Sequence, residues 1–428
     1  MKISRFNYIL YYGDFGYWFN SLTKSYFRLP KSISLKIENL MLNISDLKTD
    51  APIFFNKLKD NGFIINENID EIQIIRNNYH KFINKKDYML VILPTLNCNV
   101  HCWYCIQKHI PSKMDLHTFN NIKNHIKHMI QEEKISSLRI EWFGGEPLLH
   151  FKDIINPLSK FAINECQRYG IPYFTSCTTN GILLNKDVRS HLSAINLNYF
   201  QITLDGIQKI HDSIKFNKSI DSAFETTLNN ISATLKLNQD CIISLRINYT
   251  HETQDINIVD EIDKFIPHEL RKRITVHLKK VWQEEVSLNS FDTYIEILNK
   301  FNEHGYNANF LDIATDFVPC YVNRKFYNTI SYDGTVHKCT ASSQLYDKEY
   351  YGLIDHEGKI DWMDEFDKLH HIPSFENERC LSCKELPLCM GICPREQIKG
   401  EQYCRMEQTD IDISKAIIAF INSKYSVS

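Results

Sequence analysis

Short apolar runs alternate with amphipathic segments through the middle of the chain, residues 88–289. The runs predict six strands, and the segments between them carry apolar residues at helical spacing. Because each helical crossover returns the chain to the same end of a sheet, these units predict a parallel sheet. Six units are fewer than the eight of a full barrel, so we expect a partial (β/α)6 TIM-type barrel that is open at the carboxyl ends of its strands. The strands are expected at residues 89–96, 137–143, 172–179, 199–205, 242–249 and 274–282, and the helices at 117–130, 151–167, 186–195, 222–237 and 258–266.

The first 87 residues carry a different pattern, in which strand-like runs precede short helices. A small hairpin followed by short helices predicts a winged-helix-like module, and the alternative is a simple cap on the barrel. The strands are expected at residues 6–12 and 17–22, and the helices at 32–42, around Phe54, Phe55 and Leu58 with Gly62 after their last turn, and from Asp70 to about Lys85.

Residues 290–428 form the third predicted domain. A helix at residues 291–302 leads into an irregular, cysteine-rich region, and a helix at residues 412–424 follows it.

Composition narrows the class of protein. Hydrophobic residues make up 43% and charged residues 24% of the chain, and the net charge is −3. These values are typical of a globular protein and favour neither a nucleic-acid nor a membrane partner. The N-terminus lacks the pattern of a secretory signal, so we expect a cytoplasmic protein. Thirteen cysteines in a reducing compartment indicate metal binding or catalysis.

Three of these cysteines lie on the loop after the first predicted barrel strand. Cys98, Cys102 and Cys105 have the spacing C-x3-C-x2-C. A [4Fe–4S] cluster held by three thiolates keeps one iron open for a ligand. The alternative is a zinc knuckle completed by His101 or His109.

A second group of residues follows the second barrel strand. Gly144 and Gly145 have no Cβ, so they let a ligand approach the backbone, and Glu146 offers an acceptor for an ammonium group. A Gly-Gly pair by itself more often forms a turn. Its place beyond a strand that neighbours the cysteine loop favours a binding site.

With Tyr104 before the last cysteine, GGEP at residues 144–147, TTNG at 178–181 and ITLDG at 202–206, residues 88 to about 282 resemble the radical S-adenosylmethionine (radical SAM) superfamily. The resemblance implies that the open iron chelates the methionine part of SAM, and that the chain generates a 5′-deoxyadenosyl radical. Lys215 stands where relatives often carry Arg, a change that loses the bidentate fork. The implied SAM contacts are Tyr104, Gly144, Gly145, Glu146, Pro147, Thr178, Asn180, Thr203 and Lys215.

The seven C-terminal cysteines resemble a SPASM domain, which carries two auxiliary [4Fe–4S] clusters, so three clusters are expected in all. By this resemblance Cys320, Cys339 and Cys393 hold the first auxiliary cluster, and Cys380, Cys383, Cys389 and Cys404 hold the second. The first set is one cysteine short. Its last iron is therefore open, is bound by an oxygen ligand such as Asp316, or is bound by Cys241. Cys166 and Cys177 are expected to be small buried residues.

SPASM enzymes modify peptides or proteins, so the resemblance implies a maturase of ribosomally made peptides. Such an enzyme installs a thioether, a carbon–carbon or carbon–oxygen crosslink, or an oxidation, and takes electrons from a reductant such as flavodoxin or ferredoxin. The N-terminal module would bind the leader of the precursor at a sheet edge. The rivals are a sulfatase-maturating enzyme, a small-molecule dehydrogenase of the same superfamily and a non-catalytic iron–sulfur protein. Sulfatase-maturating enzymes carry Asp where this chain has Thr340.

Overall fold

The computed structural model describes most of the chain, namely residues 1–284, 291–308, 320–341, 350–364, 366, 375–394, 404, 407 and 412–425. The chain divides into two compact units. Unit 1 comprises Met1–Ile83, Asn309–Asn323 and His371–Ser428, and unit 2 comprises Asn84–Ala308 and Arg324–His370. Among the described residues, no helix is both long enough and apolar enough to cross a membrane.

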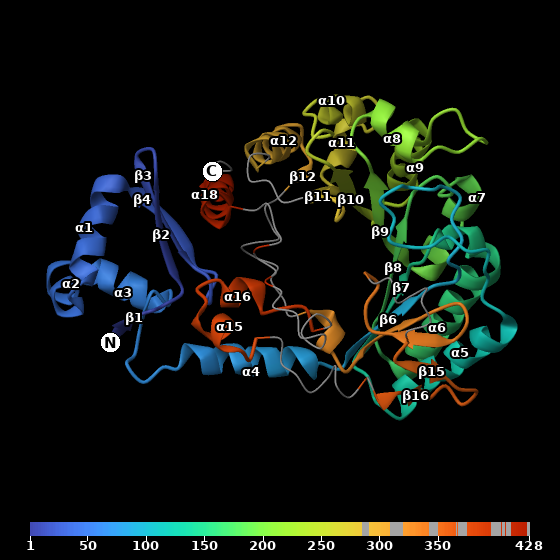
Figure 1. Cartoon of the computed structure of the whole chain (residues 1–428), viewed down its shortest axis with the longest axis horizontal. Helices are drawn as coiled ribbons and strands as arrows, with labels where there is room; N and C mark the ends of the chain where they lie inside the picture. The colour runs from blue at the N-terminus through green and yellow to red at the C-terminus, as the bar shows by residue number, and fades with distance from the viewer. Residues whose placement is uncertain are drawn as a thin grey trace. The chain divides into compact units, whose positions relative to one another are not determined.

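Unit 2 is built on one sheet, whose described strands have the order β12-β11-β10-β9-β8-β7-β6-β13-β14-β15-β16 (Figure 1). The strands from β12 to β13 are parallel, and those from β13 to β16 are antiparallel. The six central strands are β6 (Asp87–Ile92), β7 (Ser137–Trp142), β8 (Tyr173–Thr179), β9 (Leu197–Leu204), β10 (Ile242–Tyr249) and β11 (Ile274–Lys280). The others are β12 (Asn307–Ala308), β13 (Tyr327–Ile330), β14 (Thr335–His337), β15 (Gly352–Ile354) and β16 (Ile360–Trp362).

The crossover helices of unit 2 begin and end where their sequences favour it. Asp115 caps the helix α5 by accepting a hydrogen bond from the Thr118 amide (2.7 Å), and Ser222 caps α9 in the same way through Glu225 (3.1 Å). Gly170 ends α6 with a φ of 67°, which an L-residue rarely adopts. The helices are α5 (Leu116–Gln131), α6 (Asn156–Tyr169, after the π-turn Phe151–Ile155), α7 (Lys186–Arg189), α8 (Gln208–Ile214), α9 (Ala223–Leu237), α10 (Ile258–Asp263), α11 (His268–Arg271) and α12 (Phe291–Glu303).

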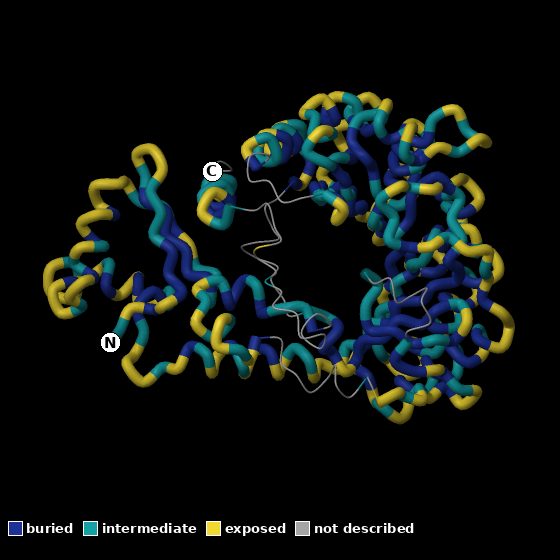
Figure 2. The backbone as a smooth tube through the Cα atoms, in the orientation of Figure 1, coloured by how far each residue is buried: buried dark blue, intermediate teal, exposed yellow. Residues whose placement is uncertain are grey.

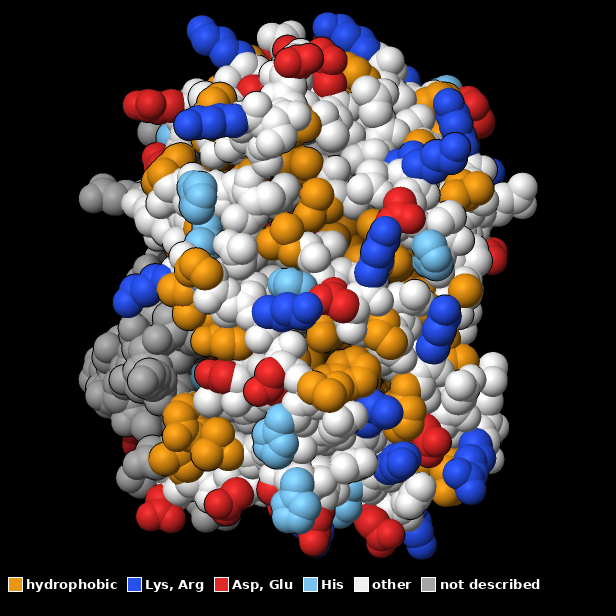
Figure 3. Space-filling view, turned by 90° about the vertical axis from the view of Figure 1, so that its right-hand side faces the viewer, with side chains coloured by type: hydrophobic (Ala, Val, Ile, Leu, Met, Phe, Trp, Pro, Cys, Tyr) orange, Lys and Arg blue, Asp and Glu red, His pale blue; other side chains and the backbone are white. Residues whose placement is uncertain are grey.

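Side chains of both charge signs are interspersed with hydrophobic ones on the face of the molecule in Figure 3. That is the mixed surface expected of a chain whose net charge is close to zero.

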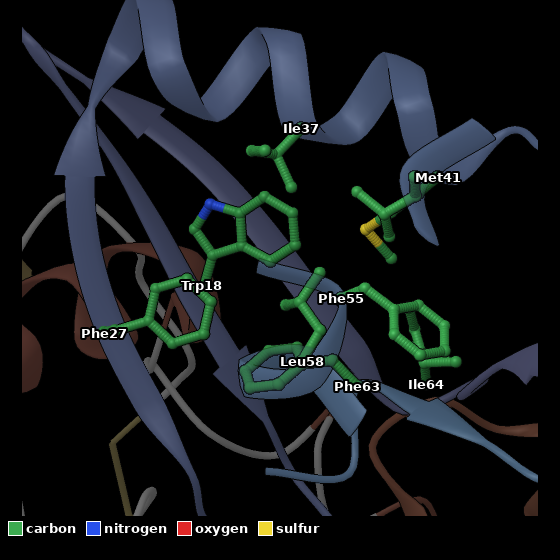
Figure 4. Close-up of a cluster of buried hydrophobic side chains, with 9 residues drawn as sticks. Trp18, Phe27, Ile37, Met41, Phe55, Leu58, Phe63 and Ile64 are labelled. Carbon is green, nitrogen blue, oxygen red and sulfur yellow. The ribbon is translucent and has the colours of Figure 1, made fainter. Parts of the chain in front are cut away.

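Unit 1 contains a three-stranded antiparallel sheet, β2-β3-β4, and a two-stranded sheet, β1-β5. Its first core packs Trp18 and Phe27 from the sheet against Ile37, Leu58 and other apolar side chains of the three following helices (Figure 4). The elements are β1 (Lys2–Ile3), β2 (Asn7–Tyr12), β3 (Phe15–Asn20), β4 (Tyr26–Pro30), α1 (Lys31–Met41), α2 (Ile44–Asp50), α3 (Pro52–Asp60), β5 (Ile64–Ile65) and α4 (Glu71–Ile83).

The C-terminal helix of the described chain, α18 (Ile413–Tyr425), packs on the strands of this same sheet. Phe420 meets the rings of Phe19 and Tyr26 at centroid distances of 6.4 and 5.2 Å, and Tyr17 donates a hydrogen bond to Asn422 (3.0 Å). Figure 2 shows the dark-blue buried backbone of β3 within unit 1. The sheet is therefore buried by residues from both ends of the chain.

The structure confirms the partial barrel of six parallel strands and the helices expected between them. It adds elements that the sequence pattern did not predict: the strand β4, the helices α2 and α8, and the strands β13 to β16 in a region expected to be irregular. The helix predicted at 186–195 is broken into α7 and a 3-10 turn at Ser193–Ile195. These elements are short, and their apolar residues show too few repeats to reveal a period.

Candidate active site

The cysteine motif lies on the long loop between β6 and α5, at the carboxyl end of the first barrel strand. The two arms of this loop are tied together at its base. The Met114 amide donates to Pro94 (2.9 Å), and the Thr95 hydroxyl donates to the carbonyl of Ser112 (2.6 Å). The loop therefore presents its cysteines at the end of the barrel where parallel-sheet enzymes place their active sites.

Cys98, Cys102 and Cys105 are each half-buried on this loop. The pKa of Cys98 is raised to about 12, mainly by burial and also by Glu146 and the two other thiols of the loop. Burial also raises the pKa of Cys102, which Lys215 opposes. Such thiols lose their protons to a bound metal, and the set has the donor chemistry of an iron–sulfur site. Among the described residues, no three His, Cys, Asp or Glu side chains already lie in the arrangement of a metal site.

Two histidines lie on the same loop. The Sγ of Cys105 is 3.5 Å from Nε2 of His109, whose Nδ1 is 3.3 Å from Nδ1 of His101. His109 therefore lies where the zinc-knuckle alternative requires a histidine ligand.

The two glycines beyond β7 are required for a close approach of backbone to backbone. A Cβ on Gly144 would lie 2.3 Å from the carbonyl oxygen of Thr95, and one on Gly145 would lie 2.1 Å from that of Asn97. Gly144 has a φ of +125°. The sequence predicted that these glycines admit a ligand. In the structure they admit the cysteine loop, which accepts hydrogen bonds from Gly145 (3.2 Å) and Glu146 (2.8 Å).

Glu146 is fully buried, and its carboxylate is hydrogen-bonded within the chain. It accepts from the amide of Leu148 (3.0 Å), the amide of Asn180 (2.9 Å) and the hydroxyl of Thr179 (2.8 and 2.9 Å). Burial raises the pKa of Glu146 to about 7, and these hydrogen bonds oppose the rise. In this structure the carboxylate joins the GGEP turn to the end of β8, so it positions both segments. Its contact with an ammonium group stays a prediction.

Asn180 connects the end of β8 to the cysteine loop. Its amide nitrogen donates to Asn99 (2.7 Å) and lies 3.9 Å from the sulfur of Cys98. The other predicted SAM contacts on the strands are half-buried: Thr178 on β8 and Thr203 on β9, whose register partner is Arg246. Pro147 comes directly after Glu146 and begins a short 3-10 turn, Pro147–His150. The structure brings these residues to the same end of the sheet as the cysteines.

Lys215 is buried and forms an ion pair with Asp205. The hydroxyl of Tyr104 donates to the same carboxylate, and Asn248 donates to the Tyr104 hydroxyl (3.0 Å). Burial raises the pKa of Asp205, but Lys215, His211 and the Tyr104 hydroxyl together outweigh burial and hold that pKa below its ordinary value. The cation predicted to contact the SAM carboxylate is therefore neutralised within the chain. The sequence analysis assigned no role to Asp205 or Asn248, although Asp205 directly follows β9 within the ITLDG segment.

A cavity of about 370 Å³ opens beside this ion pair. It lies beyond the carboxyl ends of β9, β10 and β11, and two aromatic residues of the cysteine loop form part of its wall. The cavity is large enough for a cofactor-sized molecule, and its wall combines aromatic faces with carboxylates and amides. The lining residues are Trp103, Tyr104, Asp205, Ile214, Asn248, Tyr249, Thr250, Glu252, Thr253, Val281 and Glu284.

All seven C-terminal cysteines are half-buried. Cys380 lies on α15 (Glu378–Ser382) and Cys389 ends α16 (Leu386–Cys389), and Cys383 lies between these helices and donates to Glu385 (2.9 Å). Cys320 and Cys393 belong to unit 1 and Cys339 to unit 2. The ligand set of the first auxiliary cluster stays a prediction, and Asp316 lies outside the described residues.

The remaining cysteines are buried. Cys166 and Cys177 are 0% and 1% exposed, which confirms the expected small buried residues. Cys241 is 0% exposed before the first residue of β10, and burial raises its pKa to about 12.

Comparison with known proteins identifies the central part of the chain. Residues 92–255 match the family model described as the radical SAM superfamily. The match covers the cysteine loop, the GGEP turn and the strands β7 to β10. This segment is a radical SAM domain, the kind of domain that binds SAM at a [4Fe–4S] cluster.

Curated relatives are similar at low identity. The chain is 26% identical over 151 residues to a cysteine-type anaerobic sulfatase-maturating enzyme of Clostridium novyi, a match that covers 33% of this chain and 39% of the relative. It is 23% identical over 361 residues to an Fe-coproporphyrin III synthase of Methanosarcina barkeri, covering 73% of this chain and 84% of that protein.

Solved structures share the fold. A structure of anSMEcpe with bound AdoMet and a Cp18Cys peptide aligns with a TM-score of 0.56 and 16% identity, over 79% of this chain and 99% of that one. Streptococcus suis SuiB bound to the precursor peptide SuiA aligns with a TM-score of 0.52 and 16% identity, over 97% of this chain and 99% of that one. At this identity the likeness concerns the fold alone.

Proposed function

We propose that this chain is a radical SAM peptide maturase, an enzyme that abstracts hydrogen from a ribosomally made precursor peptide and installs a crosslink or an oxidation. The observation that carries the proposal is the combination of a radical SAM domain with a sheet-and-helix module before it. The alignment with SuiB extends over 97% of the chain, whereas that with anSMEcpe covers 79%. The chain thus shares with the peptide-bound SuiB structure more than the barrel.

When bound, the cluster and SAM supply a carbon radical that removes hydrogen from an unactivated carbon. The chain's own residues position and enclose these groups. The cysteine loop provides three thiolates, and Gly144 and Gly145 let that loop lie against the GGEP turn. Asp205, Lys215 and Tyr104 form a neutral network beside the cavity. Such a preorganised wall holds reactants in place and keeps water from the reacting carbon.

The substrate is proposed to be a peptide held in part by the N-terminal module. The sheet β2-β3-β4 ends in β4, which pairs only with β3 among the described strands. An extended leader segment can add to such an edge through backbone hydrogen bonds. Electrons would come from a reductant such as flavodoxin or ferredoxin. The two auxiliary clusters assigned by the SPASM resemblance would accept electrons from the product radical or, where an iron is open, hold a substrate group.

Two other substrates have a specific observation in their favour. The relation to the Clostridium novyi enzyme supports a protein oxidase acting on sulfatases, but Thr340 follows Cys339 where such enzymes carry an aspartate. The relation to the Fe-coproporphyrin III synthase covers 73% of this chain and supports a tetrapyrrole substrate. A non-catalytic iron–sulfur protein is disfavoured because the cysteine loop and the GGEP turn are both intact.

The test uses the full chain after anaerobic reconstitution with iron and sulfide. It is given SAM, a reductant and each of three substrates: peptides encoded by short reading frames beside its gene, a cysteine-containing sulfatase peptide, and an iron tetrapyrrole. We expect 5′-deoxyadenosine to form and one encoded peptide to lose two hydrogens by mass. The C98A/C102A/C105A variant is the matched control and should form neither product. Oxidation of the sulfatase peptide, or formation of Fe-coproporphyrin III, with all encoded peptides unchanged would contradict the proposal.

A further inference from the structure

The segment that carries three of the C-terminal cysteines shares a hydrophobic core with the N-terminal part of unit 1. Phe6 from the start of the chain and Ile75 and Tyr79 from α4 pack with Phe375, Leu386 and Met390. The side chain of Cys380 packs against this core as well. All six core residues are between 0% and 8% exposed, so they form a buried core that joins residues 296 to 384 positions apart in the sequence.

Polar contacts reinforce the same join. Arg5 donates to the carbonyl of Leu381 (2.6 Å) beside Cys380. Tyr8, on β2, donates to Glu385 (3.1 Å), and the other oxygen of that carboxylate accepts from Cys383 (2.9 Å). Burial, with Glu385 adding to it, raises the pKa of Tyr8 well above its ordinary value, so the phenol keeps its proton and remains a donor.

The helix α4 is attached to the segment through its exposed side too. Arg76 makes two hydrogen bonds to the carboxylate of Glu376 (2.6 and 3.0 Å), and the ring of Tyr79 meets that of Phe375 edge-on at 5.1 Å. The strand β2 and the helix α4 are therefore both held by residues 375–390.

The segment itself contains little regular structure that would hold it in place. Its helices α15 and α16 have five and four residues, and such short helices are not stable by themselves. The segment does contain Cys380, Cys383 and Cys389, whose thiolates have the donor chemistry of an iron–sulfur site. A metal group bound there would fix the segment, because binding to the folded state alone adds its free energy to folding.

We propose that the metal site at Cys380, Cys383, Cys389 and Cys404 stabilises the N-terminal module, so that β2 and α4 are fully ordered only when this site is loaded. The inference rests on the auxiliary-cluster assignment made under the proposed function and goes beyond it. By this inference the site stabilises residues near the opposite end of the sequence, whether or not it also carries electrons.

The experiment compares the metal-free full chain with the same chain loaded anaerobically with iron and sulfide. Hydrogen–deuterium exchange, read by mass spectrometry, is followed in residues 7–12 and 71–83. We expect loading to slow exchange there by about tenfold or more. The helix α12 of unit 2 serves as an internal control and should change little, whereas α9 does not suit this purpose because its Ala223 packs with Val100 of the cysteine loop.

Matched variants separate the sites. C98A/C102A/C105A should keep the protection of residues 7–12 and 71–83, and so should C339S, since Cys339 lies in unit 2. C380S/C383S should lack this protection even after loading. Comparing this variant with the wild-type chain, both metal-free, shows whether the serines alone disturb the fold. If C98A/C102A/C105A contains iron and exchange in these residues is unchanged by loading, the inference is wrong and the cluster assignment stands. If this variant takes up no iron, the assignment itself has failed and the inference falls with it.

Discussion

The cysteine end of the barrel in unit 2 and the sheet module of unit 1 are built in opposite ways. At the barrel end, Cys98, Gly144, Asn180 and Asp205 follow successive parallel strands, so sequence order and spatial order agree. In unit 1, the sheet β2-β3-β4 is packed on α18, and Phe6 lies in a core with Leu386. The barrel end is assembled from local units, whereas unit 1 is assembled from the two ends of the chain.

This difference in construction determines which parts of the structure a single substitution affects. A residue at the barrel end affects its own loop and its neighbour in the next unit. A C-terminal residue in unit 1 affects N-terminal strands hundreds of positions away. Deleting residues 1–85 would therefore do more than remove one module. It would also expose the apolar face of α18 and the core around Phe375 and Leu386. Point substitutions are therefore the sharper tools.

The largest effect is expected at the barrel end. Replacing Cys98, Cys102 and Cys105 together by Ala removes the only thiolates of the cysteine loop, so SAM cleavage should fall to background. Iron bound elsewhere should persist, since the C-terminal cysteines are unchanged. The measurements are 5′-deoxyadenosine by chromatography and iron per chain. Undiminished 5′-deoxyadenosine in this variant would refute the assignment of the loop.

The next effect tests the two-ended construction of unit 1. Phe420 is 4% exposed and packs on Phe19 and Tyr26. Phe420→Ala should cost about 3–5 kcal/mol, as for other buried phenylalanines, and should speed hydrogen exchange in β3 and β4. Ser414→Ala, at an exposed position of the same helix, is the matched control. If exchange becomes faster only in α18, the sheet does not depend on this helix.

A pH dependence should come from Glu146 at the barrel end. Its pKa is about 7 in the folded chain against an ordinary 4.5, so the folded state binds the proton more tightly than the unfolded state does. The stability it contributes is complete below pH 4.5 and is lost as the pH rises to about 7, a change on the order of 3 kcal/mol. Glu146→Gln should remove this slope from urea unfolding of unit 2 in the metal-free chain. Glu132→Gln, at an exposed position, should keep it.

The sequence predicted the barrel because its strands and helices are long enough to show their periods, and predicted the cysteine loop because spacing alone carries its chemistry. It could not predict that Gly144 and Gly145 admit the chain's own loop, or that Lys215 pairs with Asp205, since both depend on contacts between separate β/α units. In unit 1 the limits are stronger. The packing of Phe420 on Phe19 follows from no local pattern, and β4 contains only five residues, ending in a proline.

The smallest effect is expected from the exposed ion pair of unit 1. Arg76 and Glu376 form a bidentate pair whose side chains are 32% and 29% exposed. Water and salt screen such a pair, so Arg76→Ala should speed exchange in α4 much less than Phe420→Ala speeds it in the sheet. Arg76→Lys keeps the charge but loses the two parallel hydrogen bonds of the guanidinium. Its exchange rate in α4 should therefore lie between those of wild type and Arg76→Ala. Raising the salt concentration should narrow the gap between wild type and Arg76→Ala, because only the ion pair is screened. An effect of Arg76→Ala as large as that of Phe420→Ala, and insensitive to salt, would show that α4 is held mainly by this pair and not by the core around Phe6 and Leu386.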